Sequence, residues 1–169
     1  NVKSICNLAM LCGNVGVKSG GVNPLRGQNN VQGACDMGGL PNVFPAYQPV
    51  TVEANTEKFS KARGKELPNQ IGYTMTDMVQ AMIDGKLEAL YVVGENPMLS
   101  DPDQHHLVKA LEKLDLLICQ DIFFTETAEK ADVVFAAVSV AEKDGTYTNT
   151  ERRCMKVNKA IDPIGNTLD

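Results

Sequence analysis

The sequence predicts an α/β fold in which a parallel sheet is covered by helices on both faces, a Rossmann-like arrangement. Continuous apolar runs at 87–94, 116–120 and 133–138 have the length of strands, and helical patterns separate them. Apolar runs without alternation are typical of parallel strands that are buried on both sides. The order strand, helix, strand, helix, strand requires crossover connections, which are almost always right-handed.

Residues 1–50 are expected to form the end of a helix and a long loop that carries cofactor or active-site groups. Apolar residues recur at helical spacing from the start of the chain, at Ile5, Leu8, Ala9 and Cys12. Gly13 is the expected left-handed cap. A Gly/Asn/Pro-rich stretch follows from 13 to 39, and loops of this length inside a compact domain are usually functional. Prolines make 41–49 extended or irregular. The absence of an initial Met suggests a piece cut from a longer chain.

Residues 51–169 are expected to form the α/β dinucleotide-binding domain. A short helix is predicted near 55–63, and a second helix begins after Thr74. Its apolar stripe is Met75, Met78, Val79, Met82 and Ile83. Thr74 and Asp77 form a capping pair, and Gly85 ends the helix.

The next helix and strands follow from similar signals. Ser100 is the expected cap of a helix, and the acidic residues behind it favour the positive end of the helix dipole. Its apolar stripe is Leu107, Val108, Leu111 and Leu114. Thr125 caps a short helical turn that runs through Lys130, just before the third strand.

Composition excludes several classes of protein. The formal net charge of -5 is unfavourable for binding nucleic acid or an anionic membrane. No apolar run approaches the roughly 18 residues that a membrane span needs. The five cysteines include no CxxC, so neither a disulfide framework nor a zinc or iron–sulfur site is predicted. Reduced thiols indicate a cytoplasmic protein. His105 and His106 are neighbours on a helix and cannot form one metal-binding face.

Polar residues follow the three predicted strands, and the carboxyl ends of parallel strands form one edge where ligands bind. They are Gly94, Glu95 and Asn96 after the first strand, Gln120 and Asp121 after the second, and Lys143 after the third. A carboxylate such as Asp121 can accept hydrogen bonds from the N1–H and N2–H₂ edge of guanine, and Lys143 can bind a phosphate. The alternative is that Asn96 and Asp121 cap the helices that follow. No GxGxxG or P-loop supports a conventional NAD or ATP site.

One loop segment, RGQNNVQGACDMG at 26–38, closely resembles formate dehydrogenase catalytic subunits of the molybdopterin oxidoreductase (dimethyl-sulfoxide-reductase) superfamily. Three further blocks resemble the same family in the same order, at 94–97, at 120–121 with 131–134, and at 142–153. The resemblance spans about 1–166. Its first block is specific to formate dehydrogenases, and its last block is shared across the superfamily.

The resemblance implies that this chain contributes to binding a molybdopterin guanine dinucleotide cofactor (bis-MGD) with molybdenum or tungsten. Arg26 matches the arginine that orients formate, Asn30 lies next to the pterin, and Gln28 lies near the metal pocket. Gly94, Glu95, Asn96, Gln120, Asp121 and Lys143 match positions that line a guanine dinucleotide. The cysteine or selenocysteine metal ligand and the 4Fe-4S cluster lie upstream in the family, so the chain is expected to be inactive alone. Its expected partners are formate, the remaining domains of the subunit and electron-transfer subunits.

Physical chemistry supports the role of Arg26 independently, because a planar guanidinium gives a small carboxylate two parallel charge-assisted bonds. We expect the strand-end groups to converge on a single rim beside this guanidinium. Two alternatives remain open. The chain could belong to another family member, such as a nitrate reductase or the large iron–sulfur subunit of a respiratory NADH complex. It could also be a non-catalytic nucleotide-binding or structural module.

Overall fold

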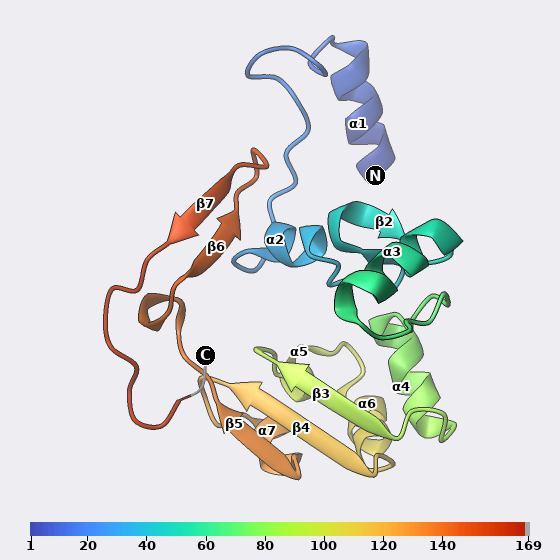
Figure 1. The fold of residues 1–169 in the computed structure, drawn as a ribbon, viewed down its shortest axis with the longest axis vertical. Helices are drawn as coiled ribbons and strands as arrows, with labels where there is room; N and C mark the ends of the chain where they lie inside the picture. The colour runs from blue at the N-terminus through green and yellow to red at the C-terminus, as the bar shows by residue number, and fades with distance from the viewer. Residues whose placement is uncertain (168–169) are drawn as a thin grey trace.

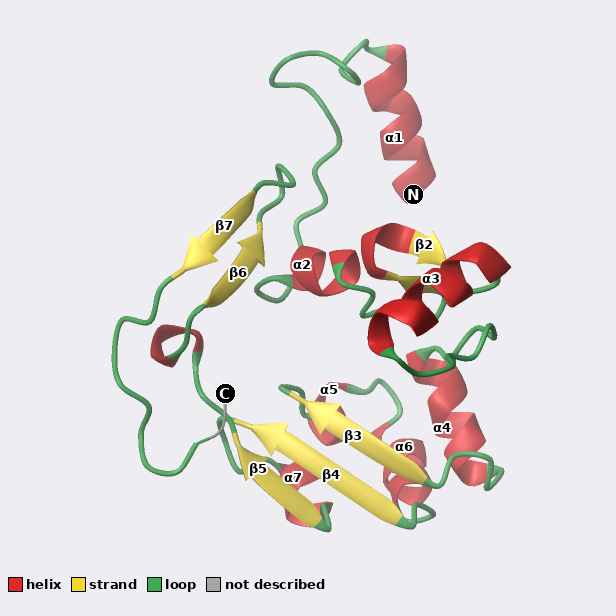
Figure 2. Cartoon of the chain, in the orientation of Figure 1, coloured by secondary structure: helices red, strands yellow, loops and turns green. Residues whose placement is uncertain are grey.

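The computed structural model describes residues 1–167, and Figures 1 and 2 show a sheet with helices at one end of the molecule and a separate hairpin. The elements before the sheet are α1 (Val2–Leu11), α2 (Val31–Asp36), β1 (Val43–Phe44), η1 (Pro45–Tyr47), β2 (Gln48–Pro49), α3 (Glu53–Arg63) and α4 (Met75–Ile83). Within 1–167 the longest helix, α3, has 11 residues. None of these helices combines the length and apolar character needed to cross a bilayer.

The three predicted strands form one parallel sheet in sequential order. They are β3 (Ala89–Val93), β4 (Leu116–Asp121) and β5 (Val133–Ala136), and β4 is central. Ala89 pairs with Leu116, and Ile118 pairs with Val133. The crossovers contain α5 (Pro97–Ser100), α6 (Gln104–Leu111) and α7 (Glu126–Lys130). The predicted α/β fold with a parallel sheet is therefore confirmed.

The core lies between this sheet and the helices α4 and α6. Its buried members are Val79, Met82, Val92, Leu107, Ala110, Leu111 and Leu117. Alternate strand residues face these helices, so Val92 and Leu117 are buried while their chain neighbours are more exposed. Most of the predicted Met stripe of α4 and most of the Leu stripe of α6 supply the other half of this core.

The prediction of helices on both faces is wrong for the described residues. Figure 2 shows α5, α6 and α7 behind the sheet. On the opposite face Tyr91 is 52% exposed and Val93 61%. Strand order explains this arrangement, because right-handed crossovers that all step in one direction place every helix on the same face. Covering the second face requires a reversal of strand order, and three sequential strands contain none. The Rossmann-like detail stays a prediction.

Most local signals of helix boundaries are confirmed, and one is corrected. Thr74 and Asp77 form a capping box at α4, and Gly85 follows it with φ +69°. The helix α6 is capped by Asp103, whose Oδ1 accepts from the backbone N–H of His106 at 3.1 Å, and not by Ser100. Ser100 instead ends α5, because Asp101 adopts an extended conformation and separates the two helices.

The first 50 residues contain little regular structure, as expected. The helix α1 ends at Leu11, and Gly13 adopts the predicted left-handed conformation with φ +69°. Residues 43–49 form two very short antiparallel strands around a 3-10 turn. The helix α3 begins at Glu53, slightly earlier than expected.

A hairpin follows the sheet and contacts the N-terminal part of the chain. It consists of β6 (Gly145–Thr148) and β7 (Cys154–Val157), and Thr148 pairs with Cys154 next to the turn. The short helix α2 packs against β6 and η1, so segments more than 100 residues apart in the chain lie side by side. All five cysteines lie within the described residues and are free.

Candidate functional site

The residues that follow β3 and β4 lie together at the carboxyl edge of the sheet. Val93 pairs with Gln120, and the backbone N–H of Gly94 donates to the carbonyl oxygen of Gln120 at 2.8 Å. Asp121 pairs with Ala136 at the end of β5. The predicted edge of polar residues is therefore formed by strand register. Gly94 leaves it with φ +64°, a conformation that favours glycine.

Asn96 connects this edge to the start of α7. Its Oδ1 accepts from Thr127 Oγ1 at 2.7 Å and from the Thr127 N–H at 3.3 Å, and its Nδ2 donates to Glu126 Oε2 at 2.6 Å. Thr127 is fully buried. Hydrogen bonds from its own backbone N–H and from Asn96 lower the pKa of the Glu126 carboxyl. Asn96 precedes α5 but makes no side-chain cap there, so the capping alternative is not observed.

Gln120 and Asp121 differ in how far their side chains are engaged. Gln120 Oε1 accepts from the hydroxyl of Tyr91. Asp121 Oδ1 accepts from the N–H of Phe123 at 3.1 Å, whereas its Oδ2 has no hydrogen bond to the described residues. Thr125, and not Asp121, caps α7. Asp121 therefore presents an oxygen that can accept a further donor.

The aspartate also influences Cys119, which is fully buried on the helix side of the sheet. Burial raises the pKa of the Cys119 thiol, and the nearby Asp121 carboxylate raises it further, while a hydrogen bond with Thr125 acts in the opposite direction. The thiol stays protonated and serves as a small apolar core group.

Two further predicted residues, Glu95 and Lys143, follow β3 and β5 along the chain. Glu95 Oε1 accepts from Ser100 Oγ at 3.3 Å. Lys143 directly follows the 3-10 turn η2 (Val140–Glu142), in the segment that leaves β5. Glu142 anchors this segment, since its carboxylate accepts from the N–H of Ser139 at 2.7 Å and of Ile164 at 2.9 Å. A hydrogen bond with the Ser139 side chain, followed by these two backbone bonds, lowers the pKa of the Glu142 carboxyl.

Arg26 lies at a different place, in a hollow of about 1350 Å³ between the loop 15–26 and the turn of the β6–β7 hairpin. Arg152 and Arg153 line the same hollow. Gln28 and the strand-end residues do not line it. The expected single rim is thus two separate sites in the described residues, one at the sheet edge and one at this hollow.

Asn30 joins the loop to the hairpin through both atoms of its amide. Its Oδ1 accepts from the N–H of Thr148 at 3.0 Å, and its Nδ2 donates to the carbonyl of Thr146 at 3.3 Å. We call this pair of bonds the Asn30 clasp. Asn30 has φ +59°, which asparagine tolerates well. The predicted contact of Asn30 with a pterin stays a prediction, since the structure engages its amide within the chain.

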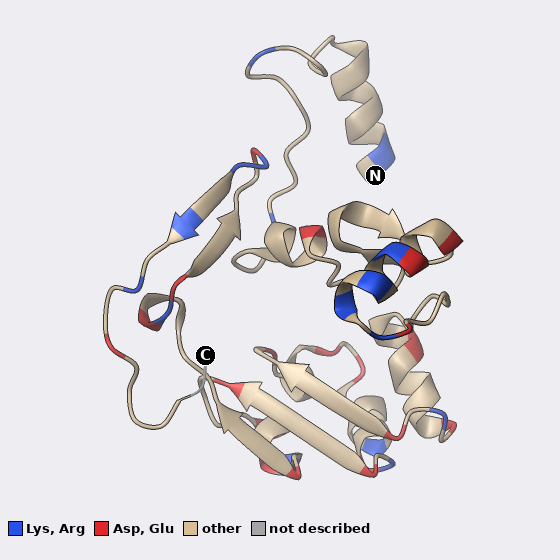
Figure 3. Cartoon of the chain, in the orientation of Figure 1, with Lys and Arg blue, Asp and Glu red and all other residues tan. Residues whose placement is uncertain are grey.

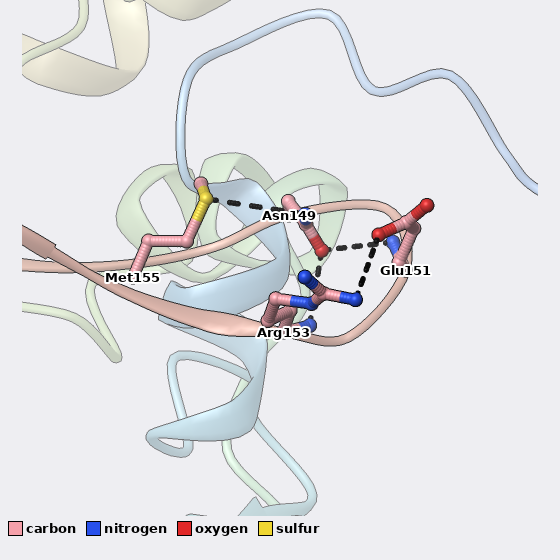
Figure 4. A network of polar contacts seen from close by, with 4 residues as sticks. All are labelled: Asn149, Glu151, Arg153 and Met155. Atoms are coloured by element: carbon pink, nitrogen blue, oxygen red, sulfur yellow. Dashed lines mark hydrogen bonds and ion pairs between the residues drawn. The ribbon is translucent and has the colours of Figure 1, made fainter.

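The hairpin turn has its own network, shown in Figure 4. Asn149 Oδ1 accepts from the N–H of Glu151 and of Arg153, each at 3.0 Å, and Glu151 pairs with Arg153 at 3.8 Å. Arg152 occupies the turn with φ +60°. Arg152 was not among the residues expected at the site. The signal available in the sequence was an asparagine shortly before two consecutive arginines.

Within residues 1–167, no group of three or more His, Cys, Asp or Glu side chains is arranged to hold a metal ion. Asp121 and Arg26 carry side chains that form hydrogen bonds and charge pairs with organic or anionic groups. The free oxygen of Asp121 matches the donor edge of guanine, and the hollow beside Arg26 matches an anion.

Comparisons with known proteins identify the family of the chain. The family model for molybdopterin oxidoreductase matches residues 1–168. The chain is 58% identical over 99% of its length to the alpha subunit of F420-dependent formate dehydrogenase 1 from Methanococcus maripaludis, of which it covers 24%. It is 47% identical over 96% of its length to formate dehydrogenase H from Escherichia coli, of which it covers 23%. The chain thus spans about a quarter of the length of these relatives.

A solved structure shows the same fold. Acetylene hydratase from Pelobacter acetylenicus aligns with a TM-score of 0.51 and 24% identity, over 68% of this chain and 17% of that protein. The family match extends across the sheet, the hollow and the hairpin. The chain therefore belongs to the molybdopterin oxidoreductase family.

Proposed function

We propose that this chain is the part of a formate dehydrogenase catalytic subunit that binds a molybdopterin guanine dinucleotide and orients formate. The observation that carries the proposal is the 58% identity to a formate dehydrogenase alpha subunit across 99% of the chain. The full subunit would oxidise formate to CO₂ with release of one proton and two electrons. When bound, the cofactor with its molybdenum or tungsten supplies the redox chemistry and accepts these electrons.

The residues of this chain would bind the guanine dinucleotide and orient formate. Asp121 Oδ2 would accept from the guanine edge, and Asn96 and Gln120 would shape the pocket around it while holding the sheet edge together. Gly94 and Glu95 would line the turn after β3, and Lys143 would bind a phosphate as a point charge. Arg26 would hold the formate carboxylate through two parallel bonds, and Gln28 would lie near the metal pocket.

The chain would act only within a larger subunit. Its described residues supply no cluster of metal ligands. The exposed apolar face of the sheet would be covered by the remaining domains of the same subunit, because parallel sheets are buried on both faces. A 4Fe-4S cluster elsewhere in the subunit and separate electron-transfer subunits would carry the electrons onward. Five free cysteines support a cytoplasmic location.

The role of Arg26 is tested in the intact subunit with Arg26→Ala and, as a matched control, Arg63→Ala at the end of α3. A hydrogen bond to a charged group contributes about 1.5–3 kcal/mol, so losing the bonds of Arg26 should lower kcat/KM for formate by roughly a hundredfold. Metal content should stay near the wild-type level. Loss of metal with unchanged activity per metal would overturn the assignment.

The role of Asp121 is tested by titrating the chain with GDP. Weak saturable binding that Asp121→Ala abolishes, and that the surface variant Asp84→Ala keeps, is the expected result. Equal binding by both variants would place the guanine site elsewhere. This measurement does not depend on formate turnover, so it separates nucleotide binding from substrate binding.

A further inference from the structure

The chain enters and leaves the β6–β7 hairpin through two segments that are bonded to each other. Residues 139–144 lead from β5 into the hairpin, and residues 159–164, which we call the return segment, follow it. Figure 1 shows the chain after β7 turning back toward the sheet, and Figure 3 shows acidic and basic residues in both segments. The carbonyl oxygen of Ala141 accepts from the N–H of Ala160 at 2.8 Å and of Ile161 at 3.1 Å, so the two segments lie side by side.

Glu142 joins the two segments through its buried carboxylate. Its Oε2 accepts from the N–H of Ser139, as in an ordinary capping box at the start of η2. Its Oε1 accepts from the N–H of Ile164, which lies 22 residues further along the chain. A cap uses only the first of these bonds. The second bond has no role within η2, and it holds the return segment against the segment that enters the hairpin.

The pair of bonds requires a carboxylate at this position. Glu142 is 8% exposed, and within residues 1–167 it forms no ion pair, so neutral donors stabilise its charge. A carboxylate offers acceptors on both oxygens, whereas an amide of the same size offers one oxygen and one NH₂ group. That NH₂ group would face the N–H of Ser139 or of Ile164, and two donors do not bond to each other. Both bonds therefore form together only with the ionised side chain.

Lys143 lies between two residues that are bonded to the return segment. Glu142 before it bonds to Ile164, and Asp144 Oδ1 after it accepts from the N–H of Lys159 at 3.0 Å. The backbone of Lys143 is extended, with φ −140° and ψ 157°. Bonds on both sides restrict the position from which its side chain leaves the backbone. The return segment therefore supports Lys143.

We propose that Glu142 is a positioning residue that acts through its charge: its carboxylate fastens the return segment to η2 and thereby fixes Lys143. This role goes beyond capping η2, because the bond to Ile164 closes the chain around the whole hairpin. The consequence for ligand binding rests on the proposed function, in which Lys143 binds a phosphate as a point charge. In that case Glu142→Gln weakens phosphate binding although Glu142 itself touches no ligand.

The test uses the full subunit, prepared free of cofactor, with Glu142→Gln and with the matched control Glu129→Gln at an exposed position of α7. Glutamine keeps the length of the side chain and one acceptor, but it replaces the other acceptor with an NH₂ group. Hydrogen–deuterium exchange of the peptide that covers the return segment measures how firmly that segment is held. Loss of a hydrogen bond to a charged group should raise the exchange rate at Ile164 about tenfold in Glu142→Gln and leave it unchanged in Glu129→Gln.

GDP binding separates positioning from a general loss of structure. Glu142→Gln should raise the Kd for GDP about threefold, the size expected of a single charge pair near the surface, and it should have no effect in a Lys143→Ala background. An exchange rate at Ile164 that matches Glu129→Gln would overturn the inference, and so would an equal rise in Kd with and without Lys143. If the wild-type subunit binds no GDP, the proposed guanine site fails, and the exchange rate at Ile164 alone decides whether Glu142 holds the return segment.

Discussion

Gly33 in α2 allows the Asn30 clasp to form, and Gly33→Ala tests this directly. A Cβ built on Gly33 would lie 2.1 Å from Asn30 Oδ1, and the three atoms nearest to it all belong to the Asn30 amide. The amide would have to move away, and both bonds to β6 would break. The 3.0 Å bond to Thr148 is expected to contribute about 1 kcal/mol and the 3.3 Å bond to Thr146 about 0.5 kcal/mol.

The substitution also has a favourable part, because Ala in a helix interior is about 1 kcal/mol better than Gly. Global stability should therefore change by only about 0.5 kcal/mol, whereas the local opening of the clasp should be easier by about 1.5 kcal/mol. The rate of amide hydrogen exchange at Thr148 measures the free energy of opening the Asn30 clasp locally. We expect its exchange rate to rise roughly tenfold in Gly33→Ala.

A double-mutant cycle isolates the cause. In an Asn30→Gly background, which keeps the left-handed backbone but removes the amide side chain, Gly33→Ala should no longer change exchange at Thr148. Gly145→Ala is the matched control, since a Cβ there meets no atom within 4 Å. Unchanged exchange at Thr148 in a folded Gly33→Ala protein would refute the reasoning.

Three other predictions concern the sheet and the segment behind it. Thr127→Val should destabilise the chain by about 1–2 kcal/mol in urea unfolding, because it removes a fully buried hydroxyl that bonds to the turn after β3. Met82→Ala should cost about 2–5 kcal/mol, since Met82 is 1% exposed in the core, while the exposed control Met10→Ala should cost less than about 0.5 kcal/mol. The pKa of Glu142 is lowered from its ordinary value of 4.5, chiefly by hydrogen bonds with Ser139, so its contribution is present above pH 4.5 and is lost as the pH falls through the lower folded pKa. Glu142→Gln should flatten this acid dependence of stability, and an unchanged dependence would show that another group titrates.

Local signals in the sequence predicted much of the fold correctly. The capping pair Thr74 and Asp77, the stop at Gly85 and the cap Thr125 are all observed. Each depends on a hydrogen bond or a backbone conformation within a few residues, so short-range pattern is sufficient. The prediction that Ser100 caps α6 was wrong, although it too concerned only local structure. Ser100 and Asp103 are both suitable capping residues three positions apart, and the extended backbone at Asp101 leaves Asp103 as the cap.

The edge of the sheet was predictable in position but not in detail. Parallel strands place their carboxyl ends together, so Gly94, Gln120 and Asp121 were expected at one edge, and register confirms it. The partners of Asn96 lie 30 and 31 residues further along the chain. No periodicity or spacing in the sequence specifies contacts of that kind, because they depend on how α7 is placed by the sheet.

The sequence alone determined the strands, most helix boundaries and the polar residues at the strand ends, since each follows from neighbours along the chain. Tertiary structure decided which face of the sheet the helices cover. Each new strand is added on the same side of the previous one, and right-handed crossovers in that order leave the other face open. It also brought the loop around Arg26 to the hairpin with Arg152, through Asn30 bonds that span 116 and 118 residues. Contacts over such separations are specified only when the whole chain has packed.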